Sequence, residues 1–442
     1  MTQWLLLMVA APFLLAFVVM CLRDPMRVAL PIFAAVIPFG GALSLGSSPF
    51  GSLSSLAGVL LAGGLVLQLI TTRRLVPNLS PTIPVWLLFL GTAGASFLWT
   101  IDRPTTTRGL VVLASLVLVY VLVATAPVDR DVVRRTENGL LVGGVAVVGY
   151  GLYQLFVLGG FPDADPQAAG PAEDGRFGND LLGPGVQAVS LLLPLVIALS
   201  RSFSQAGRGS RVVHAVIAAL MLCGVLMTGS RTGTLAAGLA LITLVWSSPP
   251  RFRKGMLIAC AVGLVTAGLV WVFNPAGVAS RSFESPTSSS GRTDIWQVGL
   301  AACPDYCGIG AGWGAYPEVY AQTQASVADA RVLVGEDGSY QPHNLWLLAG
   351  VELGVLGLVL LALGLGFSFV EAQRLPRELR GPPLSGLVGL LAAVFFLSSM
   401  EFKTFWMALI VVALYRNMVD AESRAYEPTH RLGSYPSART SQ

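Results

Sequence analysis

The residues best suited to chemistry are a few arginines and one histidine at the ends of long apolar runs. Arg231 lies in the turn Gly229–Gly233, where one apolar run ends and the next begins. The start of a helix leaves backbone N–H groups without partners and carries the positive end of the helix macrodipole. With Ser230 and an arginine added, this turn is suited to bind a phosphate or diphosphate. A solvent-facing turn with an interfacial arginine is the alternative.

The histidine follows a polar loop and precedes a long apolar run. The sequence therefore predicts that His343 lies on the first turn of a membrane helix, with Asn344 beside it. At about 100° per residue, Gly350, Gly354 and Gly357 fall on the same helix face as His343. Glycines on a membrane helix allow a neighbouring backbone to come close. The alternative is a histidine that anchors the helix at the membrane interface, above an ordinary packing stripe.

Two more arginines lie beside aromatic residues and glycines. Arg292 opens the segment that ends in Trp296, and a glycine-rich stretch follows at 304–314. Glycines permit a tight chain path near a ligand, and aromatic residues beside an arginine suit sugar rings and phosphates. Arg176 precedes Phe177 in another such segment. Residues 99–103, which include Trp99 and Arg103, form a third candidate segment for ligand contact. For each segment an ordinary loop or an interfacial anchor is the alternative.

The sequence does not predict a metal site or a cofactor. It has three histidines, and they are not clustered. Asp163 and Asp165 have the spacing of a metal-binding pair, but they lie in a proline-rich loop that is better explained as a solvated turn. Cys303 and Cys307 are four residues apart and are candidates for a disulfide on the oxidising side of a membrane, although Pro304 between them leaves this open.

The elements that must position these residues are membrane helices. The chain has 442 residues, of which 54% are hydrophobic and 12% charged, and its mean hydropathy is +0.69. Apolar runs of about 17–25 residues, each long enough to span a bilayer, recur along it. We therefore predict an all-α polytopic membrane domain over residues 1–420, followed by a disordered cytoplasmic tail at 421–442. The first run is interpreted as a span because no basic segment precedes it. Predicted spans cover 4–22, 26–45, 52–70, 82–99, 108–126, 138–160, 182–200, 212–228, 232–248, 255–273, 343–370, 383–400 and 403–418.

The connecting loops differ in charge from one side of the membrane to the other. One set of loops carries 20 of the 28 basic residues, and the other set carries the remaining 8. The richer set is expected to face the cytoplasm. The long loop at 274–342, the turn with Arg231 and the start of the His343 helix then face outward. Any anion site on that side must be built from individual arginines, because acidic residues outnumber the arginines of the long loop.

The motifs resemble those of the O-antigen ligase family over residues 212–370. His343-Asn344, nine residues, Gly354, two residues and Gly357 match the family's H-[N/S/Q]-x9-G-x-x-G signature. The turn 228–233 resembles the Ser-Arg turn that precedes the family's large periplasmic loop. Residues 292–310 resemble the arginine-bearing loop of the wider superfamily of O-antigen ligases and Wzy-type polymerases, and residues 99–102 resemble its Trp-Ser-x-Asp turn. Trp296 stands where the ligases often have leucine, which leans slightly towards polymerase or exopolysaccharide relatives.

The resemblance implies a GT-C-like membrane glycosyltransferase of the bacterial cytoplasmic (inner) membrane with about twelve spans, so one of the thirteen is expected to be false. The donor would be a glycan on undecaprenyl diphosphate, and the acceptor a sugar hydroxyl on lipid A-core of lipopolysaccharide or on a growing glycan. The transfer would be metal-independent and inverting, at a site that faces the periplasm. His343 would be the general base. The residues expected to bind the diphosphate or the substrate are Arg231, Arg292, Arg176, Ser230 and Asn344.

Two alternatives to the ligase remain open. The first is a Wzy-type polymerase. The second is a transporter or flippase for a lipid-linked glycan. Carriers place ionisable groups deep in the membrane, and Glu352 is the one acidic residue deep in a predicted span. A single buried carboxylate is thin support for a proton relay.

Overall fold

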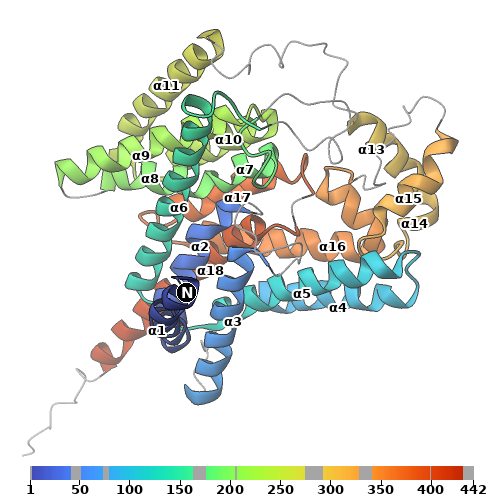
Figure 1. The fold of residues 1–442 in the computed structure, drawn as a ribbon, viewed down its shortest axis with the longest axis horizontal. Coiled ribbons are helices and arrows are strands. Elements are labelled where there is room, and N and C mark those ends of the chain that lie inside the picture. The colour runs from blue at the N-terminus through green and yellow to red at the C-terminus, as the bar shows by residue number, and fades with distance from the viewer. Residues whose placement is uncertain are drawn as a thin grey trace, which may run out of the picture.

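The computed structural model describes residues 2–40, 51–72, 79–162, 176–204, 207–273, 292–327, 341–398 and 400–431. These residues form helices joined by turns (Figure 1). Two stretches of the predicted long loop, from residue 274 to 291 and from 328 to 340, therefore lie outside the described residues.

The described residues up to 273 contain helices α1 to α11. Their bounds are α1 Thr2–Arg23, α2 Leu30–Val36, α3 Leu53–Thr72, α4 Thr82–Ala95, α5 Arg103–Thr125, α6 Arg130–Phe156, α7 Pro184–Ser190, α8 Leu192–Ser204, α9 Arg208–Met227, α10 Arg231–Ser247 and α11 Pro250–Phe273. A π-helix at Pro25–Ala29 and 3-10 turns at Ile37–Phe39 and Ser96–Leu98 extend α2 and α4.

The described residues from 292 onward contain three short helices followed by three longer ones. Their bounds are α13 Arg292–Ala301, α14 Cys303–Tyr306, α15 Tyr316–Thr323, α16 Leu345–Arg374, α17 Gly381–Ala393 and α18 Lys403–Arg431, with a 3-10 turn at Gln324–Ser326. Figure 1 shows α13, α14 and α15 gathered at one edge of the molecule beside α16.

The helices confirm an all-α polytopic membrane protein. Helical residues lie in each of the thirteen predicted ranges. Among the described residues, seven helical segments are long and apolar enough to cross a membrane, and four more apolar helices have 10–17 residues. The shorter ones include the segments 25–39 and 381–393, where prolines interrupt or shorten regular helix.

Glycines allow the helices to approach closely. A Cβ atom on Gly139 would lie 2.2 Å from the carbonyl oxygen of Pro31, so α6 and α2 touch backbone to backbone. In the same way Gly364 of α16 lies against the indole ring of Trp86 in α4. Small residues at such crossings are the usual means of packing helices in a membrane, where apolar burial alone gives no driving force.

Helix α18 runs through the core of the protein. All residues from Phe405 to Tyr415 are buried, as expected for a helix that is hydrophobic on every side. The prediction of a disordered tail from residue 421 is wrong in its first part, because α18 continues to Arg431. A bidentate ion pair between Arg130 and Glu422 holds this extension against the start of α6. Residues 432–442 lie outside the described part.

Candidate functional site

The turn before α10 has the predicted form of a helix start. Ser230 is the N-cap, and its hydroxyl accepts a hydrogen bond from the Gly233 amide at 3.1 Å. The Thr228 hydroxyl in turn accepts from the Ser230 amide at 3.2 Å. Arg231 is the first helical residue and is exposed. Ser230 therefore shapes the turn, while the amide of Thr232 stays at the open end of the helix.

His343 does not lie on the first turn of α16, and this prediction was wrong. The helix begins at Leu345, because the Asn344 side-chain oxygen accepts from the amides of Trp346 and Leu347, both at 3.0 Å. His343 precedes this cap in an exposed turn with φ of 46°. No other non-glycine residue in the described part of the chain has a positive φ. Such backbone strain outside glycine gathers at functional sites.

The predicted glycine stripe beneath the histidine is also wrong. Helix α16 is broken at Gly354, which has φ 66° and ψ −163°, so no single helical register joins His343 to Gly357. The break removes the helical partners of nearby carbonyls. Loop amides replace them: Ala311 donates to Val351 O and Gly312 donates to Glu352 O, both at 2.9 Å.

Gly354 is required by this crossing between loop and helix. A Cβ atom on Gly354 would lie 2.4 Å from the carbonyl oxygen of Gly308, and one on Gly310 would lie 2.3 Å from that of Glu352. The Glu352 carboxylate also accepts from the Tyr316 amide at 3.2 Å. Gly354 of the signature and Gly310 of the loop thus allow the loop to enter the broken helix, and Glu352 stabilises that loop.

Residues 96–101 form a support for the same loop. The Trp99 indole donates to Gly310 O at 3.1 Å, and the Ile101 amide donates to Ala311 O at 3.2 Å. The Trp313 amide donates to the Ser96 hydroxyl at 3.0 Å. The third predicted segment therefore contacts the glycine-rich stretch, and its described bonds position that loop.

Trp296 has a positioning role that the sequence did not reveal. Its indole N–H donates to the carbonyl of Pro342, the residue before His343, at 2.6 Å. Its ring also lies 6.2 Å from that of Phe396. After the histidine, the Leu345 amide donates to Val394 O at 2.9 Å. The His343 turn is therefore fixed on both sides by residues distant in sequence.

Arg292 is the first residue of α13, and its side chain lies outside the described residues. The helix itself is well anchored. Asp294, Ile295 and Val298 are buried, and the Tyr316 hydroxyl donates to Ile295 O at 3.0 Å. Since α13 also carries Trp296, its start lies on the element that fixes the histidine turn.

Arg176 lies in a compact turn between α6 and α7. The Asp180 carboxylate accepts from the Tyr150 hydroxyl at 2.7 Å and from the Gln154 amide at 2.9 Å. Phe177 is fully buried, and its ring occupies the space that a side chain on Gly151 would need. The turn is thus pinned to the end of α6, and Arg176 is partly buried within it.

The segments that carry the predicted residues meet around the end of α17. The Val394 carbonyl accepts the Leu345 amide just after the histidine turn, and the Phe396 ring lies beside Trp296, which bonds to Pro342 just before it. Leu397 lies against Gly185 at the start of α7, directly after the Arg176 turn. Helix α7 then packs its Ala188 against Gly233, two residues beyond Arg231. The structure therefore brings all four segments to one end of the protein.

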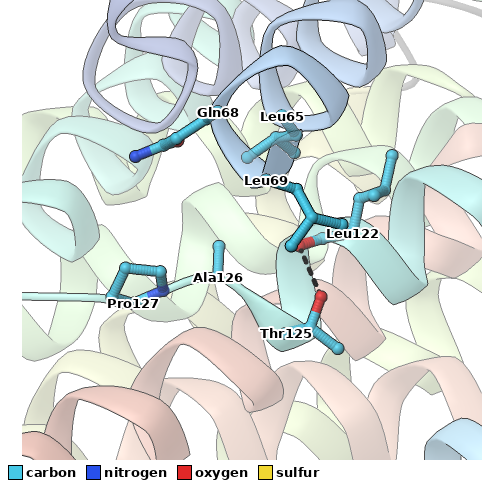
Figure 2. A pocket seen from close by; sticks show the side chains of 7 residues that line it. All are labelled: Leu65, Gln68, Leu69, Leu122, Thr125, Ala126 and Pro127. Atoms are coloured by element: carbon cyan, nitrogen blue, oxygen red, sulfur yellow. Dashed lines mark hydrogen bonds between the residues drawn. The ribbon is translucent and has the colours of Figure 1, made fainter. Parts of the chain in front are cut away.

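A small pocket between α3 and α5 is no competing substrate site. Figure 2 shows its lining, in which Leu65, Gln68 and Leu122 surround a space of about 20 Å³. A space of this size holds about one water molecule. It also lies at the ends of α3 and α5 remote from residues 96–101.

The structure bears on the candidate metal ligands and on the cysteine pair that the sequence analysis named. Within them, no three side chains of the His, Cys, Asp or Glu type are grouped as metal ligands. Cys303 and Cys307 form a disulfide across α14, which settles the alternative that the sequence left open. The Asp163 and Asp165 pair lies outside the described residues.

Comparison with known proteins identifies part of this region. A family model described as O-antigen ligase matches residues 216–362, which include Arg231, Arg292 and the histidine turn. The chain is also 27% identical over 198 residues to the exopolysaccharide production protein ExoQ of Rhizobium meliloti (strain 1021). That alignment covers 44% of this chain and 44% of the relative, so it spans less than half of either. Together with the membrane helices, these matches support the resemblance to the O-antigen ligase family, which the family model finds over residues 216–362.

Proposed function

We propose that the protein is a membrane glycosyltransferase that moves a glycan from undecaprenyl diphosphate to an acceptor sugar hydroxyl. The observation that carries this proposal is the His343 turn. It is exposed, has a positive φ, and lies in the segment that matches the family. A strained residue persists only where its surroundings hold it, and here Trp296 and Val394 do so from two sides.

His343 is proposed as the general base. A neutral imidazole can take the proton from the acceptor hydroxyl as that oxygen attacks the anomeric carbon of the donor. The glycosidic bond to the diphosphate breaks in the same displacement, so the configuration at the anomeric carbon inverts. Asn344 caps α16 with its oxygen, which leaves its amide nitrogen as the group that could contact the substrate.

The diphosphate is proposed to bind at the start of α10, with Arg231 and the Thr232 amide as donors. Arginine forms two parallel bonds to phosphate oxygens and is always charged. Arg292 and Arg176 approach the same end of the protein through α13 and the turn before α7. Arginines in these places would neutralise the leaving diphosphate without a metal ion. Ser230 would act through the shape of the turn.

The site is proposed to face the periplasm. Of the 28 basic residues, the loops on the site's side carry 8 and those on the opposite side carry 20. The side with fewer basic residues is normally translocated. This places transfer on the outer face of the bacterial cytoplasmic membrane, where a lipid-linked glycan would arrive after flipping.

A Wzy-type polymerase is the second candidate, with a growing glycan as the acceptor in place of lipid A-core. The relative described as an exopolysaccharide production protein favours it. So does Trp296, which replaces the leucine frequent in ligases and here holds the histidine turn. A transporter is less well supported, because the buried Glu352 carboxylate already accepts the Tyr316 amide.

The experiment is transfer from a lipid-linked oligosaccharide by the purified protein in liposomes. Wild-type protein should extend a glycan or label an added lipid A-core acceptor, and the product identifies polymerase or ligase. Arg231→Lys keeps the positive charge but loses the paired N–H donors of the guanidinium group. The transition state for transfer should therefore be destabilised by about 2–4 kcal/mol, which is measured as a lower kcat/KM. Arg208→Lys, on an exposed residue at the other end of the protein, is the control. Flipping of the lipid-linked glycan without transfer would refute the enzyme proposal.

A further inference from the structure

A second polar site lies at the opposite ends of α10 and α16. A groove of about 540 Å³ is lined there by Trp246, Arg253, Gln373, Arg377 and Arg380, together with smaller contributions from α10 and α17. Helix α10 separates it from the proposed catalytic site: its 17 residues are roughly 25 Å long. The groove is therefore distinct from the site around His343.

The groove arginines are Arg253, Arg377 and Arg380. Two of them, Arg253 and Arg380, are held in place by the end of α10. Arg253 donates from Nη2 to Trp246 O at 3.0 Å and from Nε to Ser248 O at 3.3 Å. Arg380 donates from Nε to Ser247 O at 3.4 Å. Trp246 and Ser247 lie in the last turn of the helix and Ser248 is its C-cap, where carbonyls lack helical partners. A guanidinium group has five N–H donors, so each of these arginines keeps donors for a ligand.

The groove arginines differ from their neighbours in charge pairing. Elsewhere at these helix ends arginines meet carboxylates: Arg27 lies 2.5 Å from Asp129, and Arg135 lies 2.6 Å from Asp131. Among the described residues no carboxylate forms an ion pair with any of the groove arginines. Three positive charges thus share one groove without a counter-ion from the described part of the chain.

The edge of the groove is apolar. Trp246 is 73% exposed, and the neighbouring Ile242 is 58% exposed. Tryptophan is enriched where the hydrocarbon of a membrane meets its headgroups, because its ring is apolar and its N–H is polar. The groove therefore offers a charged end for an anion and an apolar edge for a chain attached to that anion.

We propose that this groove binds the phosphate headgroup of an anionic phospholipid, such as phosphatidylglycerol, in the leaflet on that side. Basic pockets between membrane helices on the cytoplasmic side suit such headgroups, and arginine binds phosphate oxygens in pairs. The acyl chains would lie along Trp246 and Ile242. The proposal does not depend on which reaction takes place around His343.

The test is native mass spectrometry of the purified protein titrated with phosphatidylglycerol and, separately, with phosphatidylcholine. Arg377→Gln is the main variant, because no described bond ties the Arg377 side chain to the protein. One basic residue near a lipid headgroup is worth a factor of about five in binding. Arg377→Gln should therefore weaken phosphatidylglycerol binding roughly fivefold, and Arg377→Glu should weaken it further. Arg208→Gln removes the same charge at an exposed position outside the groove and should bind as the wild type does.

Three outcomes would overturn the proposal. The first is equal binding of phosphatidylglycerol and phosphatidylcholine. The second is a loss of binding in Arg208→Gln as large as that in Arg377→Gln, which would indicate attraction by net charge alone. The third is complete displacement of the lipid by millimolar glycerol 1-phosphate, which would assign the groove to a soluble phosphate compound.

Discussion

The positive φ of His343 gives a prediction in which stability and activity change separately. We expect His343→Gly to be more stable than His343→Ala, although both remove the imidazole. A non-glycine residue in the left-handed region costs about 1–2 kcal/mol, and φ is 46° here. Glycine avoids that cost but loses roughly 0.5–1 kcal/mol through its freer unfolded state. The net difference in unfolding free energy should be about 0.5–1 kcal/mol in favour of glycine.

The assay for this prediction is thermal unfolding in detergent, with transfer rates measured on the same samples. Both variants should transfer roughly 10²–10⁴-fold more slowly than the wild type, since both lack the base. His343→Asn is a further control, because asparagine tolerates the left-handed region; it should match His343→Gly in stability and lack activity. If His343→Ala were the more stable of the first pair, the histidine turn would not be strained and the argument from its backbone would be refuted.

Three further outcomes are expected. Trp296→Phe removes the bond to Pro342 O but keeps a ring, so kcat should fall about tenfold while donor binding stays unchanged; weaker donor binding with normal kcat would contradict this. Gly354→Ala should prevent stable folding, as judged by gel filtration in detergent, because its Cβ would meet Gly308 O. Gly366→Ala is the control and should fold normally, since no atom lies within 4 Å of its new Cβ. Equal behaviour of the two variants would contradict the contact between the loop and α16. Transfer should continue in EDTA, and a loss of activity that Mg²⁺ or Mn²⁺ restores would refute metal independence.

Hydropathy predicted the helices well because membrane spans are determined by local composition. Every predicted range contains helix, and the turn at Ser230 is a helix start as its residue types indicate. The error at the end of the chain has a different origin. Helix α18 extends beyond residue 421 because Glu422 meets Arg130, and a contact between residues 292 positions apart cannot be seen in a local pattern.

The sequence named candidate residues for the site, but it did not predict how the chain positions them. His343 was placed on a helix because the apolar run begins beside it, whereas the side chain of Asn344 delays the helix start. The glycine at 354 was interpreted as a surface for a neighbouring helix, but it is the point where a loop enters α16. The bond from Trp296 to Pro342 spans 46 residues. A pattern along the sequence gives the spacing of such residues but not which loop they meet.

The central claim is that the neutral His343 imidazole removes the acceptor proton, and a pH–rate profile tests it most directly. The measurement is the single-turnover transfer rate on donor already bound, from about pH 5 to pH 8, for the wild type, His343→Ala and His343→Gly with and without added imidazole. Protonation abolishes the base, so the wild-type rate should fall about tenfold per pH unit below the histidine's pKa, ordinarily near 6.5. The His343→Ala rate should be low and flat, and imidazole should restore part of the activity of His343→Gly. A His343→Ala protein that kept the wild-type rate and its acid limb would contradict the mechanism.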